Sequence, residues 1–211
     1  INIYNFFRFF FLSKFWFKEH KIIKSNSLNN KIDKEIYFLH GNGIPPKAYN
    51  PLLNLLANQY ILNTPLMRIF KSNTSKKTIS NWKTLADDFL KDISINNKSN
   101  EKIGIGHSMG GTILLYSAIK KPDFFSKIIL LDPVIFTPIQ CKMWRVINLL
   151  GLGMHFHPLA KKALNRKTEF NSFSDIFDRY KKYSTFKKFS NQSLKNYINS
   201  IFEQKKGKYV I

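Results

Sequence analysis

Residues 102–114, KIGIGHSMGGTIL, combine a buried-strand pattern, a glycine-rich turn and the start of a helix. Within them, Gly106-His107-Ser108-Met109-Gly110 fits G-x-S-x-G in its required strand-to-helix context. A turn this sharp strains the backbone of Ser108 and leaves no room for a Cβ at the flanking positions. It lifts the serine hydroxyl to the top of the sheet, at a helix N-terminus that favours a developing anion. We interpret Ser108 as a nucleophile; the alternative is a glycine-rich turn that happens to contain serine.

Strand and helix patterns alternate on both sides of this stretch. A continuous apolar run at 36–39 predicts a strand buried on both faces, and the patterns at 60–62 and 127–131 predict further strands. Apolar residues at three- and four-residue spacing between Thr78 and Ile95 predict an amphipathic helix, and 109–120 predicts another. The alternation predicts an α/β fold, with a mostly parallel sheet flanked by helices. Beyond Pro138 only helical patterns are evident, and we expect no buried strand there.

The composition excludes several classes of protein. The chain has 211 residues, 34 basic against 13 acidic, and a net charge of +21. Only five of the basic residues are arginines. Proteins that recognise nucleic-acid bases or phosphates favour arginine. We therefore interpret the charge as a lysine bias and expect no specific nucleic-acid partner. The single cysteine, Cys141, excludes an internal disulfide and a CxxC metal or redox site. We expect neither a metal nor a cofactor.

A second glycine-rich turn, His40-Gly41-Asn42-Gly43, follows the strand predicted at 36–39. Acyl transfer through a tetrahedral intermediate needs two hydrogen-bond donors aimed at the oxyanion. The backbone N–H of Met109, next to Ser108, is the first candidate, and the backbone N–H of Asn42 is the second. The alternative is that this segment is only a tight turn. We expect His40 to be structural in either case, since it lies before the loop.

Together, YFLHGNGIPP (37–46), the helix from Trp82 to Leu90, GIGHSMGG (104–111) and IILLDP (128–133) resemble the α/β-hydrolase superfamily. The similarity is greatest to its single-domain, lid-bearing serine hydrolases. The resemblance implies Ser108 as nucleophile, with an oxyanion hole formed by Asn42 and Met109. It divides the chain into an aromatic N-terminal segment with edge strands (1–34), an α/β core (35–138) and a helical lid (139–211).

The remaining catalytic groups are less clear from the sequence. A serine nucleophile needs a histidine base and a carboxylate, and the order in this fold is Ser, then Asp or Glu, then His. After Ser108 the histidines are His155 and His157, in the expected lid, where either is a candidate base or a residue of the pocket entrance. Asp132 is the candidate acid, or a residue that shapes the turn before Pro133.

We expect the polypeptide to be a fragment, because it begins with Ile, lacks strands that the fold requires, and ends in GKYVI, which could start the next strand region. The leading hypothesis is hydrolysis of a small-molecule carboxylic ester or related acyl bond through a Ser108 acyl-enzyme. The alternatives are a non-catalytic binding protein on the same fold and a lysine-rich membrane-surface binder. Weak contact with an anionic membrane through the aromatic N-terminal segment is compatible with the first. One cysteine and no signal-peptide pattern favour a cytoplasmic location, and no pattern specifies an oligomeric state.

Overall fold

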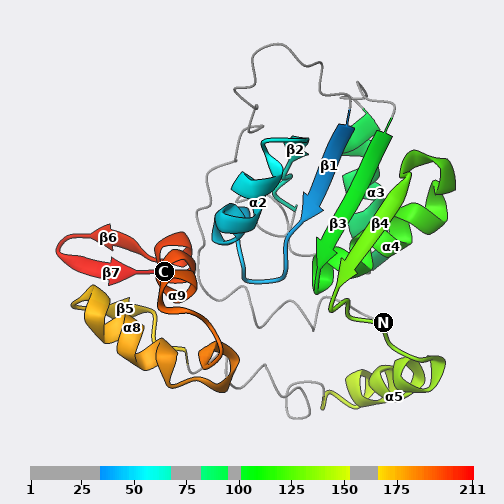
Figure 1. Ribbon diagram of the computed structural model, residues 1–211. Coiled ribbons are helices and arrows are strands. Elements are labelled where there is room, and N and C mark those ends of the chain that lie inside the picture. The colour runs from blue at the N-terminus through cyan, green and yellow to red at the C-terminus, as the bar shows by residue number, and fades with distance from the viewer. Residues whose placement is uncertain (1–33, 68–81, 95–100, 153–165) are drawn as a thin grey trace.

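The computed structural model describes residues 34–67, 82–94, 101–152 and 166–211 (Figure 1). The aromatic segment predicted at the N-terminus and the candidate bases His155 and His157 lie outside these ranges.

The predicted strands form one parallel sheet. Its strands are β1 (Lys34–Leu39), β2 (Ile61–Asn63), β3 (Glu101–His107) and β4 (Lys127–Leu131), in the order β2-β1-β3-β4 (Figure 1). The register pairs Leu39 with Gly106 and His107 with Leu131, so β1, β3 and β4 end at the same edge. The loops that follow these strands therefore gather at the carboxyl edge, where ligands bind in sheets of this kind.

β1 is buried on both faces. Ile36 and Phe38 pack on the side of α2 (Asn50–Leu56), whereas Tyr37 and Leu39 pack on the opposite side, against α3 (Trp82–Ser94) and α4 (Met109–Lys120). Phe38 and Leu39 are fully inaccessible to solvent. Burial on both faces explains the continuous apolar run of β1 and confirms the predicted α/β fold.

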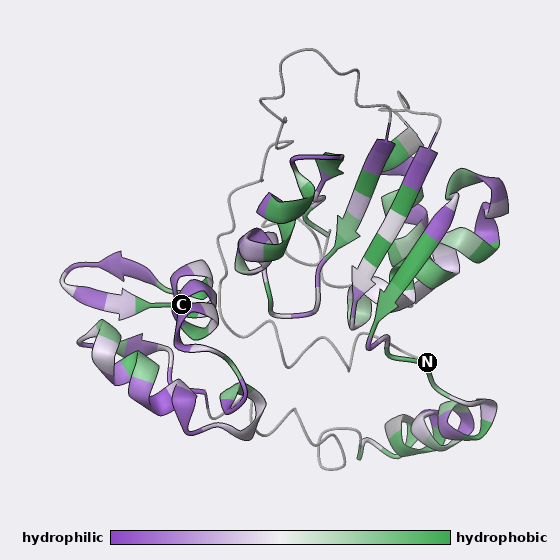
Figure 2. Cartoon of the chain, in the orientation of Figure 1, coloured by the Kyte–Doolittle hydropathy of each residue, from purple (hydrophilic) through white to green (hydrophobic). Residues whose placement is uncertain are grey.

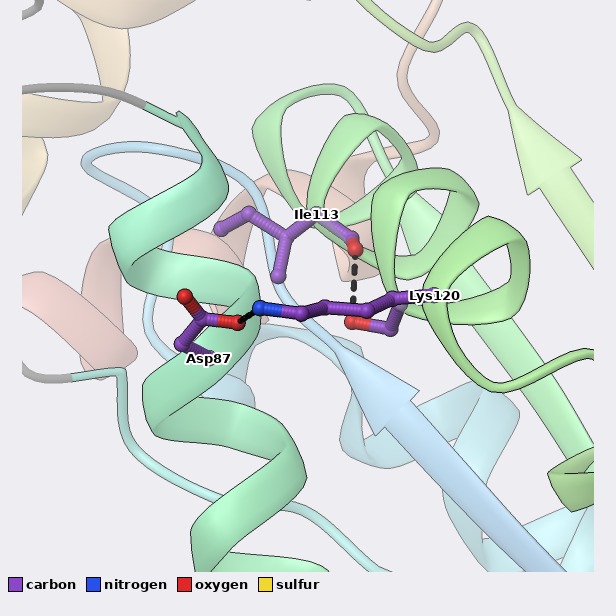
Figure 3. Close-up of polar contacts among 4 residues, drawn as sticks. Asp87, Ile113 and Lys120 are labelled. Atoms are coloured by element: carbon purple, nitrogen blue, oxygen red, sulfur yellow. Dashed lines mark hydrogen bonds and ion pairs between the residues drawn. The ribbon is translucent and has the colours of Figure 1, made fainter.

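The helix predicted between residues 78 and 95 is confirmed over Trp82–Ser94. Its apolar stripe lies in the same core cluster as α4, and all of its members in that range are buried: Trp82, Leu85, Phe89, Leu90 and Ile93. At the surface, the ammonium of Lys120 on α4 forms an ion pair with the carboxylate of Asp87 on α3 (Figure 3).

β4 is the edge strand of the described sheet. Ile128 and Leu130 pack on the core cluster of α3 and α4, whereas Ile129 is 46% and Leu131 37% exposed. The described part of the chain therefore leaves the outer edge and one face of β4 largely uncovered.

The region after Pro138 contains more than helices. Its helices are α5 (Pro138–Leu149), α8 (Phe173–Lys181) and α9 (Asn191–Ile201), with a 3-10 turn at Ser184–Phe186. Three short strands form a separate antiparallel sheet in the order β5-β7-β6: β5 (Glu169–Phe170), β6 (Glu203–Lys205) and β7 (Lys208–Val210).

The helical patterns expected there are present as α5, α8 and α9, but the region also contains short, mostly exposed strands that the sequence did not indicate. Strands of two or three residues are too short to show alternation, and Figure 2 shows the β6–β7 hairpin as mostly hydrophilic. Its tip, Lys206-Gly207, has positive φ at both positions (49° and 75°), as a two-residue type I′ hairpin turn requires. The terminal GKYVI was also misinterpreted, because β7 belongs to this small sheet and does not begin another strand region of the parallel sheet.

The C-terminal elements share an aromatic core that packs against the segment following β1. Leu194, Tyr197, Ile198 and Ile201, which recur at three- and four-residue spacing along α9, are buried. Their cluster packs against Ile44 and Ala48, and α9 contacts the 3-10 turn η1 (Pro46–Tyr49) that follows β1. Among the described helices, none has both the length and the apolar character needed to cross a membrane.

Candidate active site

Ser108 lies at the junction between β3 and α4, at the carboxyl edge of the sheet. Its backbone angles, φ 50° and ψ −117°, are strained for any residue with a side chain. The Ser108 N–H donates a hydrogen bond to the Leu131 carbonyl at the end of β4 (2.9 Å). One turn later, the Thr112 hydroxyl donates to the Val134 carbonyl (2.8 Å). The strained residue is thus held between two strand ends.

The glycines of the turn allow this close packing. A Cβ at Gly106 would lie 2.6 Å from the Gly110 oxygen, and a Cβ at Gly110 would overlap the carbonyl oxygen of Leu39. Both obstacles are backbone atoms, which cannot rotate away as a side chain could. The first turn of α4 therefore rests directly on the end of β1, and Ser108 is brought beside the loop that begins at His40.

His40 is fully buried and orders this loop. The Met67 N–H donates to its Nε2 (3.4 Å), so the proton belongs on Nδ1, which donates to the Gly41 carbonyl (3.0 Å). The same carbonyl accepts the Ile44 N–H (3.3 Å). Burial lowers the pKa of His40 to about 4, so the ring is neutral at pH 7. These contacts agree with the structural role expected for His40.

The fixed Gly41 carbonyl also fixes the direction of the Asn42 N–H. The two groups belong to one planar trans peptide and therefore point in opposite directions. Within the described residues, neither the Asn42 N–H nor the Met109 N–H donates a hydrogen bond. For Met109 the reason is its position in the first turn of α4, where N–H groups lack partners within the helix. The side-chain amide of Asn42 is buried, and both its polar atoms lack a partner.

Tyr49 and His107 connect the two loops. The Tyr49 Oη lies 2.7 Å from Nδ1 of His107 and accepts the Gly41 N–H at 3.1 Å. Burial lowers the pKa of His107, and the nearby Asp132 carboxylate partly opposes this shift. Sequence reasoning did not single out Tyr49, because nothing in its local pattern indicates a contact with a residue 58 positions away.

The other candidate groups are not bonded to the Ser108 hydroxyl in the described residues, and His155 and His157 lie outside those residues. Asp132 is exposed at the end of β4, and its φ of 47° turns the chain towards Pro133. The histidines in the described ranges are His40 and His107, and neither is hydrogen-bonded to the Ser108 hydroxyl. Those ranges also contain no cluster of potential metal ligands. The site therefore combines a strained serine with two unpaired backbone N–H groups, an arrangement suited to nucleophilic attack and anion stabilisation.

Comparison with known proteins agrees with this fold. Residues 36–196 match the family described as the alpha/beta hydrolase fold. Human monoglyceride lipase is 23% identical over 151 residues, which cover 66% of this chain and 50% of the lipase.

Solved structures give the same fold. An alpha/beta hydrolase from Novosphingobium aromaticivorans has a TM-score of 0.62 at 14% identity, covering 92% of this chain and 67% of its own. A peroxisomal alpha-beta-hydrolase from Saccharomyces cerevisiae has a TM-score of 0.55 at 18% identity, covering 92% and 64%. An esterase from Mycobacterium tuberculosis has a TM-score of 0.56 at 17% identity, covering 85% and 58%.

The chain spans half the length of the curated relative that it matches, and about two thirds of the first two of these structures. The family match covers most of the chain, and its span contains the four strands of the parallel sheet from residue 36 on, Ser108 and the loop after β1. The chain therefore belongs to the α/β-hydrolase fold family.

Proposed function

We propose that the whole protein hydrolyses a small-molecule carboxylic ester or related acyl bond, with Ser108 as nucleophile. The observation that carries this proposal is the strained backbone of Ser108 at the β3–α4 junction. Strain of this kind persists where the surrounding structure enforces it, and it gathers at active sites. No cofactor is needed for this chemistry.

In the proposed reaction, Ser108 Oγ attacks the acyl carbon while its proton passes to a base. The negative charge on the carbonyl oxygen is stabilised by the N–H groups of Asn42 and Met109. Collapse of the intermediate expels the alcohol, which takes up the proton. Water then attacks the acyl-enzyme and releases the carboxylic acid. His155 and His157 remain candidates for the base, and Asp132 for the acid that orients it.

The names of two relatives support the substrate class. One is a monoglyceride lipase and another is an esterase, so both act on esters. An ester substrate also suits a site whose identified groups are a hydroxyl and two backbone donors.

The direct test is labelling with a fluorophosphonate, which reacts with activated serines, on a protein extended to its natural termini. We expect one adduct, mapped by peptide mass spectrometry to Ser108, which disappears in Ser108→Ala. Ser126→Ala is the matched control, because its hydroxyl bonds the Lys102 carbonyl at the surface and is remote from the elbow. A folded, full-length protein that does not label would refute hydrolysis through Ser108 and favour the non-catalytic binding protein.

We further propose weak contact with an anionic membrane surface through α5. Ile139, Met143, Val146 and Leu150 form one exposed apolar stripe at helical spacing, with Lys142 beside it. α5 carries no acidic residue and extends beyond the end of β4 (Figure 1). Such a helix suits the interface of anionic lipids.

Co-sedimentation with vesicles tests this contact. We expect binding to phosphatidylserine-containing vesicles that weakens as salt rises, and little binding to pure phosphatidylcholine. Met143→Glu should reduce the binding, whereas Leu55→Glu, at an exposed apolar position of α2, should leave it unchanged. Equal binding of both variants would contradict a role for α5.

A further inference from the structure

Tyr49 contacts both loops of the candidate site through one oxygen atom. Gly41 lies in the loop after β1 and His107 at the end of β3, so the two segments are distant in sequence. The Tyr49 hydroxyl joins them, with 3.1 Å to the Gly41 nitrogen and 2.7 Å to His107 Nδ1. We infer that Tyr49 is a positioning residue, which locks the oxyanion-stabilising loop to the nucleophile turn. This inference rests on the proposed function.

The hydrogen bonds restrain both peptide units that meet at Gly41. The Gly41 N–H, in the first unit, is held by Tyr49, and the Gly41 carbonyl, in the second, is held by His40 and the Ile44 N–H. The second unit carries the Asn42 N–H. Gly41 has no side chain to limit its dihedral angles, so these bonds provide the restraint that a side chain would otherwise supply. Loss of the Tyr49 bond would free one of the two units.

The direction of the Tyr49 proton follows from the same contacts. Because Oη already accepts the Gly41 N–H, its own hydrogen is best placed to donate to Nδ1 of His107. His107 is then the neutral tautomer with its proton on Nε2. The ring next to Ser108 is thus held by the bridge and does not act on the serine hydroxyl.

Packing leaves little freedom for the bridge to move. The Tyr49 ring packs on Phe38 with centroids 4.7 Å apart, and on His107 at 5.8 Å. A Cβ at Gly41 would lie 2.7 Å from His107 Nδ1 and 3.2 Å from the Tyr49 hydroxyl, so the space between the loops is filled. Tyr49 also ends the turn η1, against which α9 packs.

The first experiment compares Tyr49→Phe with Tyr60→Phe in the full-length protein. Tyr60 borders the same apolar cluster but takes no part in the bridge, so it is the matched control. Hydrogen exchange at the Gly41 amide reports the bridge independently of activity. We expect exchange to become at least about tenfold faster in Tyr49→Phe and to stay unchanged in Tyr60→Phe. Unchanged exchange in Tyr49→Phe would overturn the bridge itself.

Fluorophosphonate labelling and ester kinetics then report the functional role. In Tyr49→Phe we expect the labelling rate and kcat to fall about tenfold, with KM within about twofold, because a misaligned donor weakens the transition state more than substrate binding. An equal change in kcat and KM, or none in labelling, would overturn the positioning role. No labelling of the unsubstituted protein would instead refute the proposed function, whatever the exchange data show.

A pair of His107 variants separates alignment from general packing. His107→Asn keeps an acceptor close to the position of Nδ1, whereas His107→Leu removes it. We expect His107→Asn to retain most of the labelling rate and of the Gly41 protection, and His107→Leu to lose both, as Tyr49→Phe does. Equal losses in the two variants would contradict a role based on the hydrogen bond.

Discussion

Gly110 in the first turn of α4 packs directly against the carbonyl oxygen of Leu39 at the end of β1. No side chain fits between them, and neither partner can yield without moving a buried main chain. This contact sets how closely the Ser108 turn approaches the loop that begins at His40. A side chain inserted between Gly110 and Leu39 should therefore affect both the stability of the protein and the candidate site.

We expect Gly110→Ala to lower the free energy of unfolding by about 3 kcal/mol, the upper range for overpacking a core. Gly151→Ala is the control, because Gly151 has a φ of +72° but a Cβ added there would meet no atom within 4 Å, so only conformational strain is tested. Urea denaturation measures both variants. If Gly110→Ala lowers the free energy of unfolding no more than Gly151→Ala does, close packing against Leu39 is not what requires glycine at position 110.

A second stability prediction concerns a buried carboxylate on β1. The Tyr37 hydroxyl donates to Glu35 Oε2 at 2.7 Å, and both residues are almost inaccessible. Tyr37→Phe leaves that oxygen without this donor, so we expect a loss of about 1–3 kcal/mol in the free energy of unfolding. Tyr116→Phe, at a partly buried position beside the same cluster, should change it by less than about 0.5 kcal/mol. Similar losses in both variants would contradict the role of this hydrogen bond.

The ion pair between Asp87 and Lys120 should contribute little (Figure 3). Both side chains are more than one third exposed, so water and salt screen their attraction. We expect Asp87→Asn to change the free energy of unfolding by less than about 1 kcal/mol, with a smaller difference at high salt. A loss above about 2 kcal/mol that persists in about 1 M salt would show that this contact matters more than its exposure indicates.

The protein should lose stability in mild acid because of His40. Its pKa is 6.5 when unfolded and about 4 in the buried site, so the unfolded chain binds the proton first. The free energy of unfolding is therefore not reduced by His40 above pH 6.5. It falls as the pH falls towards 4, by about 3 kcal/mol in total. The lowered pKa of His107 acts in the same direction. Urea denaturation from about pH 7.5 to about pH 4.5 should show this slope, and His40→Gln should flatten it; an equal slope in both proteins would exclude His40 as its source.

The elements that could be predicted from sequence are those whose signals are local. β1 and α3 show apolar patterns that follow directly from burial, on both faces of a strand or along one stripe of a helix. The Ser108 turn is also encoded locally, because the positions two residues before and after Ser108, Gly106 and Gly110, must be glycine. The short strands β5 to β7 lack such a signal, since two or three residues cannot display a period.

The missed part of the site depends on tertiary contacts. Tyr49 matters because the fold brings it between Gly41 and His107, and no spacing rule connects these positions. Glu35 is similar: a carboxyl group would be expected at the surface, but Glu35 is buried and its Oε2 accepts a hydrogen bond from Tyr37, two positions on. Local patterns therefore predicted which segments meet at the site, but not which side chains hold them together.

The side chain of Asn42 gives the last prediction. Its amide nitrogen and oxygen are buried without a partner, an arrangement that costs stability, whereas the oxyanion donor proposed here is its backbone N–H. Asn42→Ala removes the unpaired groups but keeps that N–H. We therefore expect a free energy of unfolding about 1 kcal/mol higher, while fluorophosphonate labelling of Ser108 persists. Asn63→Ala, on the partly buried end of β2, is the control and should not be stabilising. If Asn42→Ala loses labelling while its stability is preserved, the oxyanion donor is the side-chain amide of Asn42 and not its backbone N–H. The amide would then contact the ligand itself.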